Sequence, residues 1–135
     1  MKPFTFTVAV GALCAGGLAV HTLADDAKPA AVERHIIEKH DLSGVPGKEV
    51  LIGTATFPPG GIVGAHTHPG DEAGFIVKGS GTLRVQGQPD RPLKAGDAFF
   101  NARGAVHSVV AGPDGTTVVS SWIVDKGVPM ATPVP

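Results

Sequence analysis

Short apolar or alternating runs, separated by glycine and proline, follow one another from residue 33 to residue 124. No window in this part of the chain carries a helical stripe longer than about two turns. Many short strands with turn residues between them are typical of a β-sandwich or β-barrel. The predicted strands are residues 33–38, 49–57, 64–68, 73–78, 82–85, 98–100, 106–110 and 116–124. The pattern therefore predicts an all-β fold in a single domain.

The breaks between these runs contain the residues that turns require. Gly79-Ser80-Gly81 is interpreted as a hairpin turn, and Gly112-Pro113-Asp114-Gly115 is interpreted as another break. Composition agrees, because 19 glycines and 12 prolines interrupt the chain too often for helices. A hydrophobic fraction of 42% is nevertheless too high for a disordered chain.

The first 24 residues follow a different pattern. Lys2 precedes a charge-free apolar run at residues 8–20, and small residues end at Ala24, ahead of Asp25. This is the plan of a secretory signal peptide, so we predict a periplasmic or secreted protein. A retained membrane anchor or a buried helix is the alternative, but the run is shorter than the roughly 20 residues that cross a bilayer.

The rest of the chain divides into three parts. Residues 25–32 are predicted to be a flexible lead-in, 33–126 a β-barrel domain and 127–135 a proline-rich tail. The only cysteine, Cys14, leaves with the leader, so the remaining chain cannot form an internal disulfide. The net charge is −1 and no basic cluster occurs, which makes nucleic acid and anionic membranes poor partners.

Three histidines and one glutamate form the main candidate for a functional site. His66 and His68 stand two apart on a predicted strand, where residues i and i+2 point to the same face. Glu72 follows a Pro69-Gly70 turn, and His107 opens a later strand. Imidazole nitrogens and a carboxylate suit one divalent transition metal ion, namely Fe, Mn, Co, Ni, Cu or Zn. Histidines on strands are often ordinary hydrogen-bonded residues, but this combination favours a metal site.

The spacing of these residues resembles the two motifs of the cupin family. The first motif is glycine, five residues, HxH, three residues, glutamate, six residues and glycine, and Gly60, His66, His68, Glu72 and Gly79 occupy its defining positions. In the second motif Gly96, Gly104 and His107 stand at the expected intervals, whereas Ala102 replaces a proline and Ala111 an asparagine. The resemblance covers about residues 49–124.

This resemblance implies a small single-domain cupin of the quercetin-dioxygenase-like group. The expected fold is a jelly-roll barrel of six to eight strands with the metal inside, and the expected assembly is a homodimer. The implied function is a mononuclear metal-dependent oxygenase acting on a small organic substrate, in which Glu72 is both a ligand and a proton acceptor. A non-redox isomerase, decarboxylase or lyase and a non-catalytic module that binds metal or a small ligand stay open as alternatives.

Several other side chains receive weaker predictions. His35 and His40 lie in a charged segment and are expected to face solvent. A small apolar pocket is expected to include Val63, Ile76 and Val109. The aromatic residues predicted in the core or on a dimer face are Phe57, Phe75, Phe99, Phe100 and Trp122, and Asp71 and Arg103 are candidates for the rim of the site.

Overall fold

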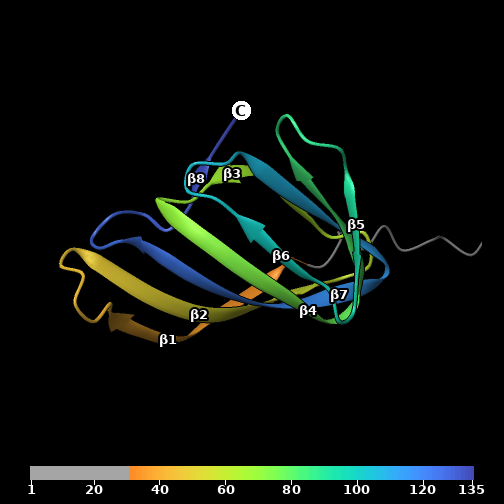
Figure 1. The fold of residues 1–135 in the computed structure, drawn as a ribbon. Coiled ribbons are helices and arrows are strands. Elements are labelled where there is room, and N and C mark those ends of the chain that lie inside the picture. Colours follow the sequence, from red (N-terminus) through yellow and green to blue (C-terminus); the bar gives the residue numbers. More distant parts are fainter. Residues whose placement is uncertain (1–30) are drawn as a thin grey trace, which may run out of the picture.

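The strands of the protein are seen in a computed structural model that describes residues 31–135. They are β1 (Glu33–Asp41), β2 (Lys48–Phe57), β3 (Ile62–Thr67), β4 (Gly70–Val85), β5 (Arg91–Lys94), β6 (Ala98–Asn101), β7 (His107–Asp125) and β8 (Thr132–Pro133) (Figure 1). The all-β prediction is confirmed for these residues. They contain no helix that is long and apolar enough to cross a membrane. The predicted signal peptide, residues 1–24, lies outside the described residues, so export stays a prediction.

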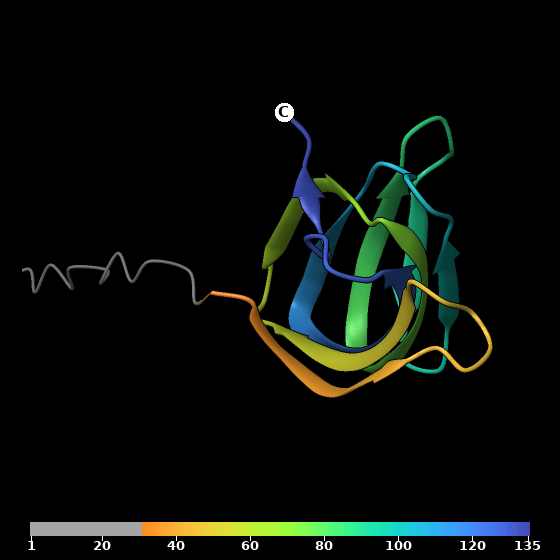
Figure 2. The same ribbon diagram turned by 90° about the vertical axis from the view of Figure 1, so that its left-hand side faces the viewer.

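All eight strands belong to one antiparallel sheet with β7 at its centre. β7 pairs with β2, β3 and β4, while β1 lies beside β2 and β8 beside β3. β4 also pairs with β5 and β6. The sheet curls around a central space (Figure 2). Within residues 31–135, β1 and β8 lie at opposite ends of the strand order and do not pair with each other, so the sheet is not closed. The predicted barrel is therefore corrected to an open, barrel-like jelly roll.

Two predicted breaks lie inside long strands. β4 continues through Gly79-Ser80-Gly81 with shifts of register, and β7 continues through residues 112–115. At Gly79 φ is 76°, and a Cβ there would lie 2.0 Å from the carbonyl oxygen of Gly115. A bulge bends a strand and keeps it paired, whereas a turn reverses it. These glycines therefore mark the bend and close approach of two strands, and the predicted hairpin turn is wrong.

Two short strands were not expected from the sequence. β5 contains Pro92 and a single buried residue, Leu93. β8 lies in the proline-rich tail, where Pro133 pairs with His66 and the Val134 amide donates to the Ala65 carbonyl over 2.9 Å. Neither segment is long enough to show a two-residue alternation. The tail is nevertheless part of the sheet beside the candidate site.

The concave face of the sheet carries two apolar clusters. The larger contains Phe57, Ile76, Leu83, Leu93, Phe99, Ala111 and Val118, and the smaller contains Leu51, Trp122 and Val124. Three of the five aromatic residues singled out above are thus buried. Phe75 and Phe100 are instead 47% and 60% exposed, so they do not belong to the core. The predicted homodimer is not tested by this structure of a single chain and stays a prediction.

Gly70 is a position where the sheet has no room for a side chain. A Cβ there would lie 1.9 Å from the carbonyl oxygen of Ile123 and 2.6 Å from Cα of Val124, which are backbone atoms of the neighbouring strand. We expect Gly70→Ala to lower the free energy of unfolding by about 1–3 kcal/mol, as overpacking does. Gly64→Ala is the matched control, because a Cβ there meets nothing within 4 Å. Urea unfolding of both variants measures the difference, and equal midpoints would contradict the expectation.

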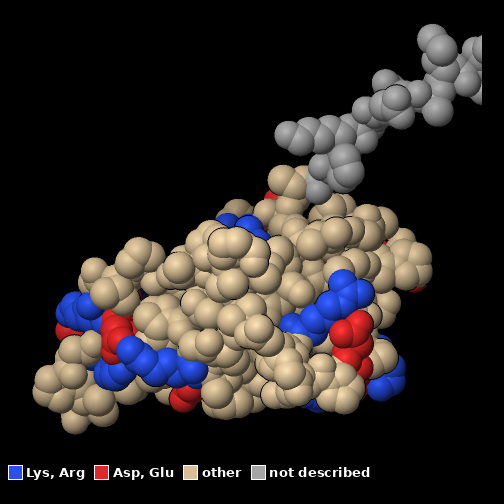
Figure 3. All heavy atoms as spheres, turned by 90° about the horizontal axis from the view of Figure 1, so that it is seen from above, with Lys and Arg blue, Asp and Glu red and all other residues tan. Residues whose placement is uncertain are grey.

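Exposed charges are paired locally. Arg84 lies 3.0 Å from Asp90, and Lys94 lies 3.1 Å from Asp97. On the face shown in Figure 3, basic and acidic side chains also lie next to one another. Because opposite charges offset each other locally, this face presents no continuous basic surface of the kind that phosphate backbones attract.

Candidate metal centre

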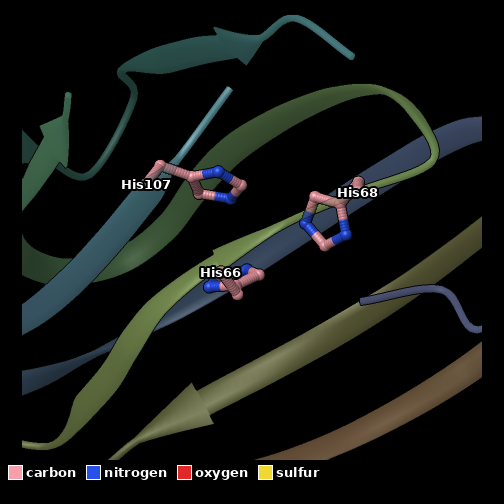
Figure 4. A group of neighbouring side chains, drawn as sticks. All are labelled: His66, His68 and His107. Carbon is pink, nitrogen blue, oxygen red and sulfur yellow. The ribbon is translucent and has the colours of Figure 1, made fainter. Parts of the chain in front are cut away.

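The side chains of the three histidines lie close together (Figure 4). His66 lies near the end of β3, His68 directly follows that strand, and His107 is the first residue of β7. Ring centroids are 4.9 Å apart for His66 and His68, 4.2 Å for His66 and His107, and 5.0 Å for His68 and His107. The candidate ligand atoms all lie within 4.8 Å of one another. The structure therefore contains a three-histidine group that can hold a metal ion.

Each of the three imidazoles is oriented by a backbone carbonyl. Nδ1 of His66 lies 2.8 Å from the Gly64 oxygen, Nδ1 of His68 lies 2.7 Å from the Met130 oxygen, and Nδ1 of His107 lies 2.9 Å from the Ala105 oxygen. A carbonyl only accepts hydrogen bonds, so Nδ1 carries the proton in each ring. The lone pair of each neutral imidazole is then on Nε2, which is the arrangement that metal-binding histidines require.

A glycine turn connects the two segments that carry these histidines. Gly104 has a φ of 72°, which glycine adopts without strain, and its amide donates to the His68 carbonyl over 3.1 Å. The next residue, Ala105, supplies the carbonyl that orients His107. Gly104 therefore connects the turn after His68 with the turn before His107. This connection forms although Ala102 stands where the motif has a more rigid proline.

Glu72 lies beside the histidines and is buried. Its Oε2 is 3.5 Å from Nε2 of His68 and 3.3 Å from Nε2 of His107, and it accepts a hydrogen bond of 2.9 Å from Nδ2 of Asn101. Burial opposes ionisation, but hydrogen bonds with His107, His68 and Asn101 outweigh it and hold the pKa of Glu72 well below its usual range. Glu72 is therefore a carboxylate at neutral pH. Its role as a fourth ligand stays a prediction.

These residues fit a metal ion by geometry and by chemistry. Two donors that each lie about 2.1 Å from one ion are about 3.0 Å apart at a right angle and about 3.4 Å apart in a tetrahedron. The separations of 3.3 and 3.5 Å from Oε2 of Glu72 are close to these values. Unprotonated Nε2 atoms and a carboxylate are also all acceptors, so a cation has to lie among them, either a proton or a metal.

The pKa values of His66 and His68 are shifted by the groups that surround them. Burial, together with the neighbouring His107 and His68, lowers the pKa of His66 against the opposing hydrogen bond to Gly64. Burial also disfavours the charged form of His68, but the hydrogen bonds with Glu72 and Met130 raise its pKa overall. The two shifts differ in direction because His68 is hydrogen-bonded to the Glu72 carboxylate, whereas burial and the neighbouring imidazoles dominate at His66.

A cavity of about 430 Å³ opens beside this group. One end is polar, with the three histidines, Glu72 and Asn101. Val63, Ile76 and Val109, expected from the sequence to line a pocket, do so, and Phe99 and Val118 extend the apolar part of the wall. Among the described residues that line it, Arg34 is the single arginine or lysine. His35 and His40 are exposed, as predicted, although His35 reaches the rim of the cavity.

The predicted rim residues Asp71 and Arg103 are joined by a hydrogen bond outside the histidine group. The Arg103 amide donates to Oδ1 of Asp71 over 2.9 Å, and its guanidinium donates to the Pro69 carbonyl and to Asp125. These bonds join the turn after His68 to the turn before His107. Asp71 and Arg103 are not among the residues that line the cavity.

Asn101 and Met130 contact candidate ligands, and sequence reasoning missed both. Asn101 is 2% exposed and holds the Glu72 carboxylate, and it is opposite Glu72 in the β4–β6 pairing. Met130 contributes only its carbonyl, which any residue supplies, so no side-chain pattern signals it. Asn101 ends the short β6, and its one signal is a polar residue that follows buried Phe99 at a two-residue spacing.

We expect Asn101→Ala to weaken Zn²⁺ binding by about tenfold, because partners that orient metal ligands typically contribute 10- to 100-fold in affinity. The fold should persist, since the change removes one hydrogen bond from the site. Competition with a fluorescent zinc chelator measures the affinity. An unchanged affinity would show that Glu72 is positioned without Asn101.

Comparisons with known proteins agree with the geometry of the site. A family model described as the cupin domain matches residues 53–124. The oxalate-binding protein of Thermotoga maritima is 36% identical over 76 residues, which are 56% of this chain and 60% of that protein. The dimethylsulfoniopropionate lyase DddW of Ruegeria pomeroyi is 34% identical over 68 residues, or 50% of this chain and 44% of that protein.

A solved structure shows the same fold. The crystal structure of a cupin-like protein from Thermotoga maritima superposes with a TM-score of 0.59 and 27% identity, over 76% of this chain and 75% of that chain. The two curated relatives are matched over less than two thirds of their own lengths.

Proposed function

The chain belongs to the cupin family, and on that premise we propose that it is a metal-dependent enzyme that binds a small organic anion at the three-histidine centre and oxidises it with molecular oxygen. One observation carries the proposal: three imidazoles, each held through Nδ1 by a backbone carbonyl, lie at the polar end of a cavity with their candidate ligand atoms within 4.8 Å of one another. Glu72 is proposed as the fourth ligand. His66, His68, His107 and Glu72 would hold the metal, and a redox-active ion bound there would supply Lewis-acid and oxygen chemistry.

Charge supports an anionic ligand. A divalent ion with the Glu72 carboxylate leaves one positive charge at the centre, and Arg34 adds a second at the cavity wall. The apolar part of the wall strengthens this attraction because it excludes water. A small carboxylate or enolate therefore fits the cavity better than a neutral or cationic molecule.

Acid–base properties favour oxygen chemistry over proton abstraction. The depressed pKa of Glu72 makes it a good ligand and a weak base. The other titratable side chains on the described wall are the three histidines, Arg34 and His35. His35 is exposed and pairs with Thr54 at the rim, so it is poorly placed to take a proton near the histidine centre. Apart from the candidate metal ligands, the described wall therefore places no base beside the histidine centre, which supports an oxidation over proton abstraction.

A non-redox lyase or a binding protein is the second candidate, and the names of the two curated relatives favour it. One is an oxalate-binding protein and the other a dimethylsulfoniopropionate lyase. Both names refer to small molecules. Under this alternative the same residues would hold the metal and the anion, without oxygen.

The deciding experiment combines elemental analysis with oxygen uptake. Protein purified without chelators is analysed for transition metals and then mixed with a panel of small carboxylates, catechols and flavonols in an oxygen electrode. Iron, copper or manganese together with substrate-dependent oxygen uptake supports the proposal. Turnover that continues without oxygen would select the lyase, and tight binding without turnover would select the binding protein.

A further inference from the structure

Arg34 lines the same cavity as the histidines, although it lies on the exposed edge strand β1. It is opposite Ala55 in the β1–β2 pairing, and Ala55 packs against the larger apolar cluster on the concave face. A Cβ on Gly53 would lie 3.2 Å from both Cδ1 of Ile36 and Cζ3 of Trp122, so Ile36 also lies on this face. Directly paired residues, and residues i and i+2, share a face of a sheet. Arg34 therefore reaches over the cavity from its open side.

Arg34 also has no carboxylate to offset its charge among residues 31–135. The lysines and arginines that form ion pairs there are Lys39, Lys48, Arg84, Lys94, Arg103 and Lys126. A guanidinium at the wall of a largely apolar cavity is a strong partner for a carboxylate, which it can bind through two parallel hydrogen bonds.

The strand register gives the part of the separation between Arg34 and the metal end of the cavity that lies along the strands. Ala55, the partner of Arg34, pairs with Val118 on β7, whereas Glu72 pairs with Trp122 on the same strand. Val118 and Trp122 are four residues apart, or about 13 Å along the strand. The long arginine side chain covers part of this distance. Ile76, Phe99 and Val118 line the cavity between the two ends.

We propose that Arg34 binds the second anionic group of an elongated small acid whose first anionic group lies at the histidine centre. The inference rests on the proposed function and narrows its substrate class to acids with two anionic ends and an apolar middle. A cavity of about 430 Å³ has room for such a molecule. Oxalate, whose two carboxylates are directly bonded, is too short to reach both ends at once.

The test compares two acids with chains of equal length. Adipate has carboxylates at both ends of a six-carbon chain, and hexanoate has one. Zn²⁺-loaded full-length protein is titrated with each acid, with calorimetry as one readout and fluorescence of Trp122 as the other, because Trp122 is the only tryptophan of the chain and lines the cavity. We expect adipate to bind at least about tenfold more tightly than hexanoate, since a hydrogen bond to a charged group has this magnitude.

Two variants separate a specific role of Arg34 from a general effect of charge. Arg34→Gln should remove the preference for adipate, while Zn²⁺ binding and the affinity for hexanoate stay the same. Arg84→Gln makes the same change of charge at an exposed ion pair away from the cavity wall, and it should keep the preference.

The outcomes also separate this inference from the proposed function. If the Zn²⁺-loaded protein binds neither acid, or if Arg34→Gln keeps the preference for adipate, Arg34 is an ordinary solvated charge on an edge strand and the inference is wrong. The metal centre would stand in both cases. If the wild-type protein does not bind Zn²⁺ at all, the proposed function is wrong, and the inference fails with it.

Discussion

His107→Ala is expected to abolish stoichiometric metal binding. The substitution removes one of three convergent imidazoles, and its Nδ1 bond to the Ala105 carbonyl shows that this ring is held in place for a ligand on Nε2. Replacing a partner that only orients a ligand lowers metal affinity by about 10- to 100-fold. Deleting the ligand itself should therefore weaken binding by at least about 100-fold. Zinc calorimetry and elemental analysis of the purified protein measure the loss, and His66→Ala should behave in the same way.

His40→Ala is the control for this experiment. His40 is exposed, its Nε2 bonds to Glu38 on the same strand, and it does not line the cavity. The His40→Ala protein should bind one metal ion per chain with the wild-type affinity. Thermal unfolding of all variants without metal shows whether the fold survives. Stoichiometric metal in both His66→Ala and His107→Ala would contradict the metal centre.

The convergence of the histidines followed from sequence because it depends on local geometry. His66 and His68 share a face through the two-residue period of a strand, and the glycine near His107 marks a turn. The orientation of the rings did not follow, because it depends on the carbonyls of Gly64, Ala105 and Met130, which every residue type offers. That part of the site is determined by how the tail and turns pack.

The strands were predicted where a run of apolar and β-branched residues is bounded by glycine and proline, as in β2. The continuity of β4 and β7 was missed, because Gly79 and Gly115 were interpreted as turn residues. They are needed where the two strands approach each other, a contact between positions far apart in sequence. A glycine that ends a strand and a glycine that allows a bend have the same appearance in a single sequence.

The position of Arg34 also depends on contacts between strands that a single sequence does not reveal. It lies in a charged segment that predicts a solvated strand, and the whole of β1 is indeed exposed. Only the pairing of β1 with β2 shows that one face of this strand is on the cavity side of the sheet. The place of Arg34 at the cavity was therefore hidden from sequence reasoning, although the histidine group was not.

Glu72→Gln is the second substitution with a large expected effect, because it tests how much the buried carboxylate contributes to Zn²⁺ affinity. The amide keeps the shape of the side chain, but it loses the negative charge that lies 3.3–3.5 Å from Nε2 of His107 and His68. We expect Zn²⁺ affinity to fall at least about tenfold and any metal-dependent turnover to be lost, because the charge is absent from the ligand set. Asn101→Ala, which keeps the charge and loses one hydrogen bond, serves as the comparison and should be the milder variant.

Acid titration of the metal-free proteins provides a second, independent readout of Glu72. Burial opposes its ionisation, but its hydrogen bonds with His107, His68 and Asn101 hold the folded-state pKa below the ordinary value of 4.5. Ionised Glu72 therefore stabilises the folded state above pH 4.5, and this contribution is lost as the pH falls below that value. Glu72→Gln has no such group, so its free energy of unfolding should decline less between pH 5 and pH 3. Identical acid profiles for the two proteins would show that Glu72 is not an ionised, hydrogen-bonded carboxylate, and its proposed role as a ligand would lose its physical basis.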